Sequence, residues 1–149
     1  MFSVRCKALI SAVLMCLSVS ALSEQIVFGP ESVRAQVERP SGWILKNIND
    51  GARQGIELSS PDRNSRVSFL FENKQGRDLK EYAVSQSAAL GMLNVKRLNA
   101  QTYGLFPDDS ARKQSVSVGI IEDYFLTTAI SGSDVQALKA VCRSFKRAH

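Results

Sequence analysis

The chain has 149 residues, of which 44% are hydrophobic and 22% are charged, and its formal net charge is +5. Its basic residues are spread along the sequence, which argues against a nucleic-acid binder because such proteins gather basic residues on one face. The one histidine, His149, is the last residue, so the sequence offers no Ser-His-Asp triad, Cys-His pair or HExxH zinc site. The nine glycines form neither GxGxxG nor GxxxxGKS/T. We therefore expect no catalytic residue, metal site or cofactor.

Residues 1–23 have the pattern of a cleaved export signal. Arg5 and Lys7 give a short positive start, and the 15 residues from 8 to 22 are mostly apolar. Spanning a bilayer takes about 20 apolar residues, so this run is short for a membrane anchor. Its length fits the core of a signal peptide. We expect export to the periplasm or secretion, with a retained anchor as the weaker alternative.

The end of this segment carries the small residues that signal peptidase requires. Ala21 and Ser23 occupy the −3 and −1 positions of a cut before Glu24, and a cut two residues earlier also fits. A lipid anchor on Cys16 is disfavoured, because the bulky Met15 precedes it. The expected product of cleavage is not membrane-spanning.

Residues 24–149 are long enough for one domain with a hydrophobic core. Cys6 and Cys16 leave with the signal, so Cys142 has no partner for an intrachain disulfide. The residues at helical spacing around Cys142 are apolar, which predicts a packed and unreactive thiol.

Strands dominate the first half of the expected domain. Residues 33–37 alternate apolar and polar, and residues 40–43, PSGW, form a turn that ends in the one tryptophan. Residues 55–60 and 66–73 are strand-like and are separated by the turn PDRN. The expected buried face of the second strand holds Val67, Phe69 and Phe71.

A helix is expected over residues 78–90, where Asp78 and Glu81 form a capping box. Residues 94–98 and 100–106 follow as short strands. The expected apolar stripe of the helix consists of Leu79, Tyr82, Ala83 and Leu90.

The last part of the chain predicts a hairpin and a second helix. Residues 114–121 alternate apolar and polar, and the acidic pair 122–123 turns the chain into residues 124–131. The helix spans residues 133–147, with a capping box formed by Ser133 and Gln136. Its expected apolar face holds Val135, Leu138, Val141, Cys142 and Phe145.

About six strands and two separated helices, joined largely by short turns, predict an α+β domain with an antiparallel sheet covered by helices. Strands and helices do not alternate regularly, so a doubly wound nucleotide-binding fold is not expected. We find no linker or repeat that would divide residues 24–149 into two domains.

The polar loop FPDDSARKQ, residues 106–114, is the candidate binding surface. Its tip carries both signs of charge, in Asp108, Asp109, Arg112 and Lys113. An ordinary solvated loop is the alternative for any one of these residues. The Ser-x-x-Lys spacing over residues 110–113 occurs without the partner motifs of the enzymes that use it, and the two aspartates lack the alternating spacing of a calcium loop.

Trp43 and Tyr103 are candidates for a small-molecule pocket. A single tryptophan after a Pro-Gly turn more often plugs the open end of a sheet. Stacking of Trp43 and Tyr103 on a ligand is the minority alternative.

The order of these elements and three short motifs resemble the PsbP-like superfamily (PsbP/Mog-type). The motifs are Pro-x-Gly-Trp at 40–43, Asp-Leu-x-x-Tyr at 78–82 and Ser-Phe at 144–145. The chain departs from the family pattern at Ala100, where many bacterial relatives have glycine. The resemblance implies an α-β-α sandwich and a binding or accessory role rather than catalysis, without naming one function.

Our first hypothesis is therefore an exported, non-enzymatic binding or accessory module. It would act through protein–protein contact in the periplasm or envelope, in one version as an inhibitor or immunity partner. The alternative is a small-ligand or lipid-binding domain with a pocket near Trp43. An enzyme that uses only carboxylates, or Ser110 with Lys113, is the third hypothesis.

Overall fold

The computed structural model describes residues 23–109 and 112–149, so residues 1–22 of the expected signal segment, Cys16 among them, and Ser110 lie outside the described residues. The elements in chain order are β1 (Glu24–Phe28), the 3-10 helix η1 (Glu31–Val33), β2 (Ala35–Arg39), β3 (Ile44–Asn49), β4 (Arg53–Ser59), β5 (Ser65–Asn73), α2 (Leu79–Leu90), β6 (Asn94–Asn99), β7 (Thr102–Phe106), β8 (Gln114–Ile121), β9 (Tyr124–Gly132), α3 (Val135–Ser144) and β10 (Lys146–Arg147).

The strands form two antiparallel sheets. The larger has seven strands in the order β3-β4-β5-β9-β8-β7-β6, and the smaller has three in the order β1-β2-β10. The larger sheet thus consists of two meanders, β3-β4-β5 and β6-β7-β8-β9, joined where β5 pairs with β9. The predicted α+β class with an antiparallel sheet is confirmed. The described residues contain ten strands rather than about six; the strand ranges marked in the sequence correspond to seven of these, and β1, β3 and β10 were not predicted.

Strands β5 and β8 were both predicted from the alternation of apolar and polar residues, and their burial follows this alternation. In β5, Val67, Phe69 and Phe71 are fully buried, as expected. In β8, Val116 and Val118 are buried between less buried neighbours. The β8–β9 turn contains Glu122 with φ of 52°. Alternation therefore assigns one face of each strand to the core.

The start of α2 agrees with its predicted cap. The Asp78 carboxylate accepts a hydrogen bond from the Glu81 backbone N–H at 3.2 Å. The expected stripe is wrong at its end, because Leu90 is 37% exposed. The helix ends at Gly91, whose φ of 66° reverses the chain, and Met92 then enters the core fully buried.

Helix α3 begins two residues later than predicted, at Val135, and ends three residues earlier, at Ser144. Asp134 is its N-cap rather than Ser133, and its carboxylate accepts from the Ala137 backbone N–H at 3.2 Å. The backbone N–H of Asp134 donates to the hydroxyl of Ser65, which is itself buried in β5. This bond ties the start of the helix to the sheet. Beyond Phe145 the chain becomes β10 and pairs with β2.

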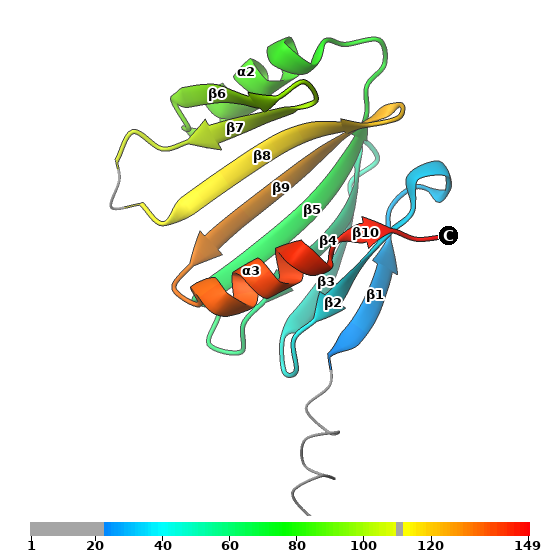
Figure 1. Cartoon of the computed structure of the whole chain (residues 1–149), viewed down its shortest axis with the longest axis vertical. Helices are drawn as coiled ribbons and strands as arrows, with labels where there is room; N and C mark the ends of the chain where they lie inside the picture. The colour runs from blue at the N-terminus through cyan, green and yellow to red at the C-terminus, as the bar shows by residue number, and fades with distance from the viewer. Residues whose placement is uncertain (1–22, 110–111) are drawn as a thin grey trace, which may run out of the picture.

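The core has two parts on opposite faces of the large sheet. The first cluster lies against α3 and the small sheet, and the second lies against α2. Phe125 belongs to the second cluster whereas its neighbour Leu126 packs on the first, since successive strand residues point to opposite faces. Figure 1 shows α2 beside β6 and β7 at one end of the sheet, and α3 crossing β5 next to β2 at the other.

Each face of the large sheet is thus covered over only part of its area, one by α3 with the small sheet and the other by α2. The face that α3 covers at β5 continues beyond the helix over β8, β7 and β6, which α2 covers from the opposite side. Neither helix in the described ranges, 23–109 and 112–149, is long and apolar enough to cross a membrane.

Candidate binding groove

Two adjoining hollows lie where α3 leaves the sheet face open. The apolar hollow has a volume of about 350 Å³ and lies between α3 and the β6–β7 hairpin. The basic hollow has a volume of about 460 Å³ and lies between the start of α3 and the start of β8. Both are lined by Ser115 and Ile130, so we treat them as one continuous feature, the groove.

The floor of the apolar hollow is a row of small side chains across the sheet. The strand register pairs Lys96 with Gly104, Gly104 with Ser117, Ser117 with Thr128 and Thr128 with Phe69. Directly paired residues of an antiparallel ladder share a face, so this row runs across the open face. The row has a cation at the sheet edge, small groups in the middle and an aromatic ring beneath α3.

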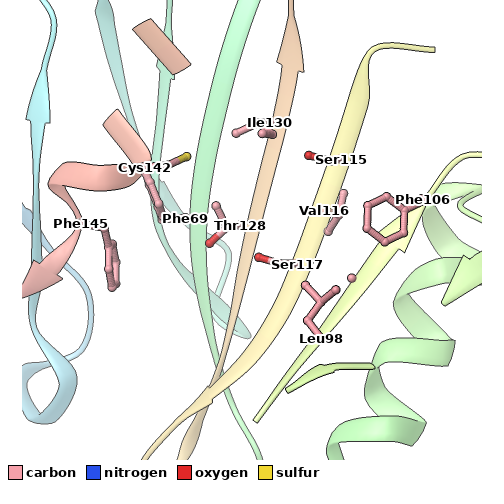
Figure 2. Close-up of a pocket in the computed structure, with 11 residues that line it drawn as sticks. Phe69, Leu98, Phe106, Ser115, Val116, Ser117, Thr128, Ile130, Cys142 and Phe145 are labelled. Carbon is pink, nitrogen blue, oxygen red and sulfur yellow. The ribbon is translucent and has the colours of Figure 1, made fainter. Parts of the chain in front are cut away.

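Aromatic and aliphatic side chains form the two walls. Figure 2 shows Leu98 and Phe106 on one side of the hollow, and Cys142 and Phe145 on the other. Phe106 folds back over Gly104, because a Cβ added there would lie 2.7 Å from the phenylalanine ring. Only glycine at this position leaves the ring its present place.

The basic hollow combines three cations with apolar surface. Arg112 and Lys113 come from the segment before β8, and Lys139 comes from α3. The apolar part includes Val135, which is 48% exposed, and the buried Leu138. A positive end therefore adjoins the apolar hollow through the shared lining of β8 and β9.

The structure brings Arg112 and Lys113 of the predicted loop site to this groove, but it does not bring Asp108 there. The Asp108 carboxylate instead accepts a hydrogen bond from the Asn94 side chain at 3.0 Å, at the start of β6. The Asp109 backbone carbonyl accepts from the Arg112 N–H at 3.1 Å, and the Lys113 carbonyl accepts from the Gly132 N–H at 3.2 Å. The two cations of the predicted loop thus join Lys139 of α3, which sequence reasoning did not single out.

Trp43 and Tyr103 are not brought together. Trp43 is 7% exposed and belongs to the first core cluster. Tyr103 packs against the second cluster, on the opposite face of the large sheet. Trp43 is therefore a core residue, as a packing role would require. Neither residue lines the groove, so the minority alternative of a pocket formed jointly by Trp43 and Tyr103 is a different site from the groove.

Cys142 is half-buried in the wall of the apolar hollow, and Figure 2 shows its sulfur directed from α3 toward Ile130. Burial raises the pKa of this thiol, because a thiolate is poorly solvated there. The raised pKa agrees with the predicted unreactive thiol. The side chain nevertheless lines the groove, so the rate of its alkylation can be used to detect an occupant.

The groove combines polar, cationic and apolar side chains. Its lining offers hydroxyls, amines, a guanidinium and apolar side chains. Within residues 23–109 and 112–149, no group of three or more histidine, cysteine or acidic residues is placed to hold a metal ion. Apolar contact combined with attraction for negative charge is what this arrangement can provide.

Comparison with solved structures identifies the fold. The solution structure of cyanobacterial PsbP (CyanoP) from Synechocystis sp. PCC 6803 matches with a TM-score of 0.56 and 15% sequence identity. The match covers 86% of this chain and 94% of that one. No family model matches the sequence, and no curated protein sequence matches it. The chain has a PsbP-like fold.

Proposed function

We propose that this protein is an exported, non-enzymatic binding module that engages a partner protein through the groove. The observation that carries the proposal is the open half of the sheet face, where large apolar side chains remain at the surface. Leu98 is 55% exposed at one end of the groove, and Val135 is exposed at the other. Exposed apolar side chains gathered around a groove support its assignment as an interaction site.

The openness of the groove favours a protein as its occupant. Pockets for small molecules enclose most of the ligand surface, roughly 70–90%. The two hollows here are partly open to solvent, so they would enclose a small molecule incompletely. A partner protein would cover the rest of the groove surface with its own residues. Export, on the pattern of residues 1–23, places this contact in the periplasm or outside the cell.

A small apolar ligand or lipid is the second candidate. The volumes of the hollows, about 350 and 460 Å³, lie within the range of ligand sites. This alternative places the ligand between α3 and the β6–β7 hairpin rather than beside Trp43. An inhibitor or immunity role remains a special case of the first candidate, and it requires nanomolar affinity for one secreted enzyme.

Site-specific photo-crosslinking in the native envelope fraction tests the proposal. A photoreactive amino acid at position 98 should yield one stoichiometric protein adduct. The same group at position 44, an exposed isoleucine on the opposite edge strand β3, should not. Ser117→Trp, which fills the apolar hollow, should abolish the adduct, whereas Ser68→Trp, on the other face of the sheet, should leave it.

Equal adducts from positions 98 and 44 would refute the groove as the binding surface. If native mass spectrometry detects a co-purified small molecule that is lost in Ser117→Trp, the second candidate, a small-ligand or lipid-binding domain, replaces the first. Circular dichroism and urea unfolding of both tryptophan variants establish that each is folded.

A further inference from the structure

The groove carries positive charge at both ends of its apolar part. Lys96 lies at the β6 edge, with its ammonium nitrogen 5.9 Å from the centre of the Phe106 ring. Arg112, Lys113 and Lys139 line the basic hollow. The floor between these ends is uncharged, since it is built from glycine, serine and threonine. An occupant of the apolar part therefore has cations in both directions along the groove.

Two of the carboxylates near the groove have hydrogen-bond partners within the chain. Asp108 accepts a hydrogen bond from Asn94. Asp134 caps α3 by accepting from the Ala137 N–H. The ion pairs found in the described part of the chain lie elsewhere, and they use Arg39, Arg53, Arg66, Arg77 and Arg147. The groove thus joins apolar surface to positive charge, whereas those five arginines are held by acidic side chains.

We propose that the groove accepts an acidic segment of the partner protein, with one large apolar side chain seated over Ser117 and carboxylates reaching Lys113 and Lys139. This inference rests on the function proposed above and adds the chemistry of the partner. The apolar side chain is held between Phe106 and Phe145, above the row of small residues. The carboxylates meet the positive end, where opposite charge raises both the association rate and the specificity.

The apolar anchor and the charges make separable contributions. The anchor removes apolar surface from water, and salt does not screen this contribution. The carboxylates interact with exposed cations, and salt screens this attraction over about 8 Å at physiological ionic strength. Binding should therefore weaken with salt without disappearing, and removal of either contribution should leave the other.

Synthetic peptides of equal length test the inference in solution. The first carries one phenylalanine flanked by glutamates, the second has lysines in place of the glutamates, and the third has alanine in place of the phenylalanine. Fluorescence anisotropy should show at least tenfold tighter binding of the first than of either other peptide. Mass-spectrometric mapping should show that the first peptide slows maleimide alkylation of Cys142, because the bound side chain covers the wall that holds the thiol.

Charge reversal locates the contact. Lys113→Glu combined with Lys139→Glu should weaken the acidic peptide at least tenfold and tighten the basic one. The matched control, Lys46→Glu with Lys80→Glu, makes the same change in net charge at exposed positions on β3 and α2 and should change neither affinity. An equal loss in both double variants would overturn the inference, since it would reflect net charge alone.

The remaining outcomes separate this inference from the proposed function. If the protein shows no preference for the acidic peptide at concentrations up to about 1 mM, the inference is overturned. The proposed function is then still decided by comparing the crosslinked adducts from positions 98 and 44. If dodecanoate slows the alkylation of Cys142 and none of the peptides does, the occupant of the groove is an anionic amphiphile rather than a protein. Peptide binding that survives Ser117→Trp would place the acidic segment outside the groove and refute the inference.

Discussion

Tyr82 offers a quantitative test of how α2 is attached to the sheet. Its ring stacks on Phe125 with 4.1 Å between ring centres, and the Arg77 guanidinium lies 5.2 Å from the Tyr82 ring centre. The side chain is 5% exposed, and its hydroxyl is hydrogen-bonded to Glu72 and Thr127. Burial, reinforced by the bond to the Glu72 carboxylate, raises the pKa of Tyr82 to about 12.

This shift has a defined consequence for stability. An unfolded tyrosine ionises near pH 10, whereas Tyr82 in the folded protein keeps its proton until about pH 12. The contribution is fully present below pH 10 and is lost as pH rises through the folded pKa, because the unfolded chain releases its proton first. Two pH units correspond to between about 2 and 3 kcal/mol of unfolding free energy.

Tyr82→Phe removes this pH dependence. Urea unfolding followed by circular dichroism, at several values between about pH 9 and pH 12, should show a shallower alkaline loss in the variant than in the natural protein. Glu72→Gln should remove part of the effect, since burial is the larger cause of the shift. Tyr103→Phe, a matched hydroxyl deletion beside the same cluster, is the control. Identical alkaline slopes for the natural protein and Tyr82→Phe would refute the reasoning.

Three further predictions concern a cap, a turn and the thiol. Asp78→Ala should lower the unfolding free energy by about 1 kcal/mol in urea titrations, while Asp78→Asn keeps an acceptor for the N–H of Glu81 and should lose less. Gly132→Ala should destabilise by about 1–3 kcal/mol or more, because φ is 123° and a Cβ would lie 2.2 Å from the Asn64 carbonyl oxygen; a variant with an unchanged midpoint would contradict this. Cys142 should be alkylated more slowly in the folded protein than in urea near neutral pH, and faster as pH rises, because its pKa is raised; equal rates in both states would count against a buried thiol.

The sequence predicted the elements whose pattern is local and regular. The strand of residues 66–73 and the hairpin of 114–131 alternate clearly, and the cap at Asp78 marks the first helix. Strand β3 was missed because Ile44 is exposed on the sheet face opposite to Phe69, while Asn47, on the Phe69 face, pairs with buried Ile56, so its pattern does not separate core from solvent. Strand β10 has only two residues and exists through its pairing with β2.

The groove was predictable only in part, because its lining comes from distant segments. The loop cations were identified as a cluster, but their neighbour Lys139 is placed by the docking of α3. One signal was present in β8, where Ser115, Ser117 and Gly119 alternate with apolar residues. Small side chains on one face of a central strand indicate that this face is not filled like a core. The walls depended on the strand order, which hairpin patterns alone do not determine.

The pairing of β5 with β9 also governs how the chain reaches its folded state. The nearest partners across this seam, Asn73 and Tyr124, are about fifty positions apart, whereas each neighbouring meander pairs strands that are close in sequence. Closing so long a loop has a larger entropic cost than closing a hairpin, and non-local pairing of this kind slows folding. We expect the two meanders to form from local contacts, and the pairing of β5 with β9, as between Phe69 and Thr128, to join them into one cooperative unit.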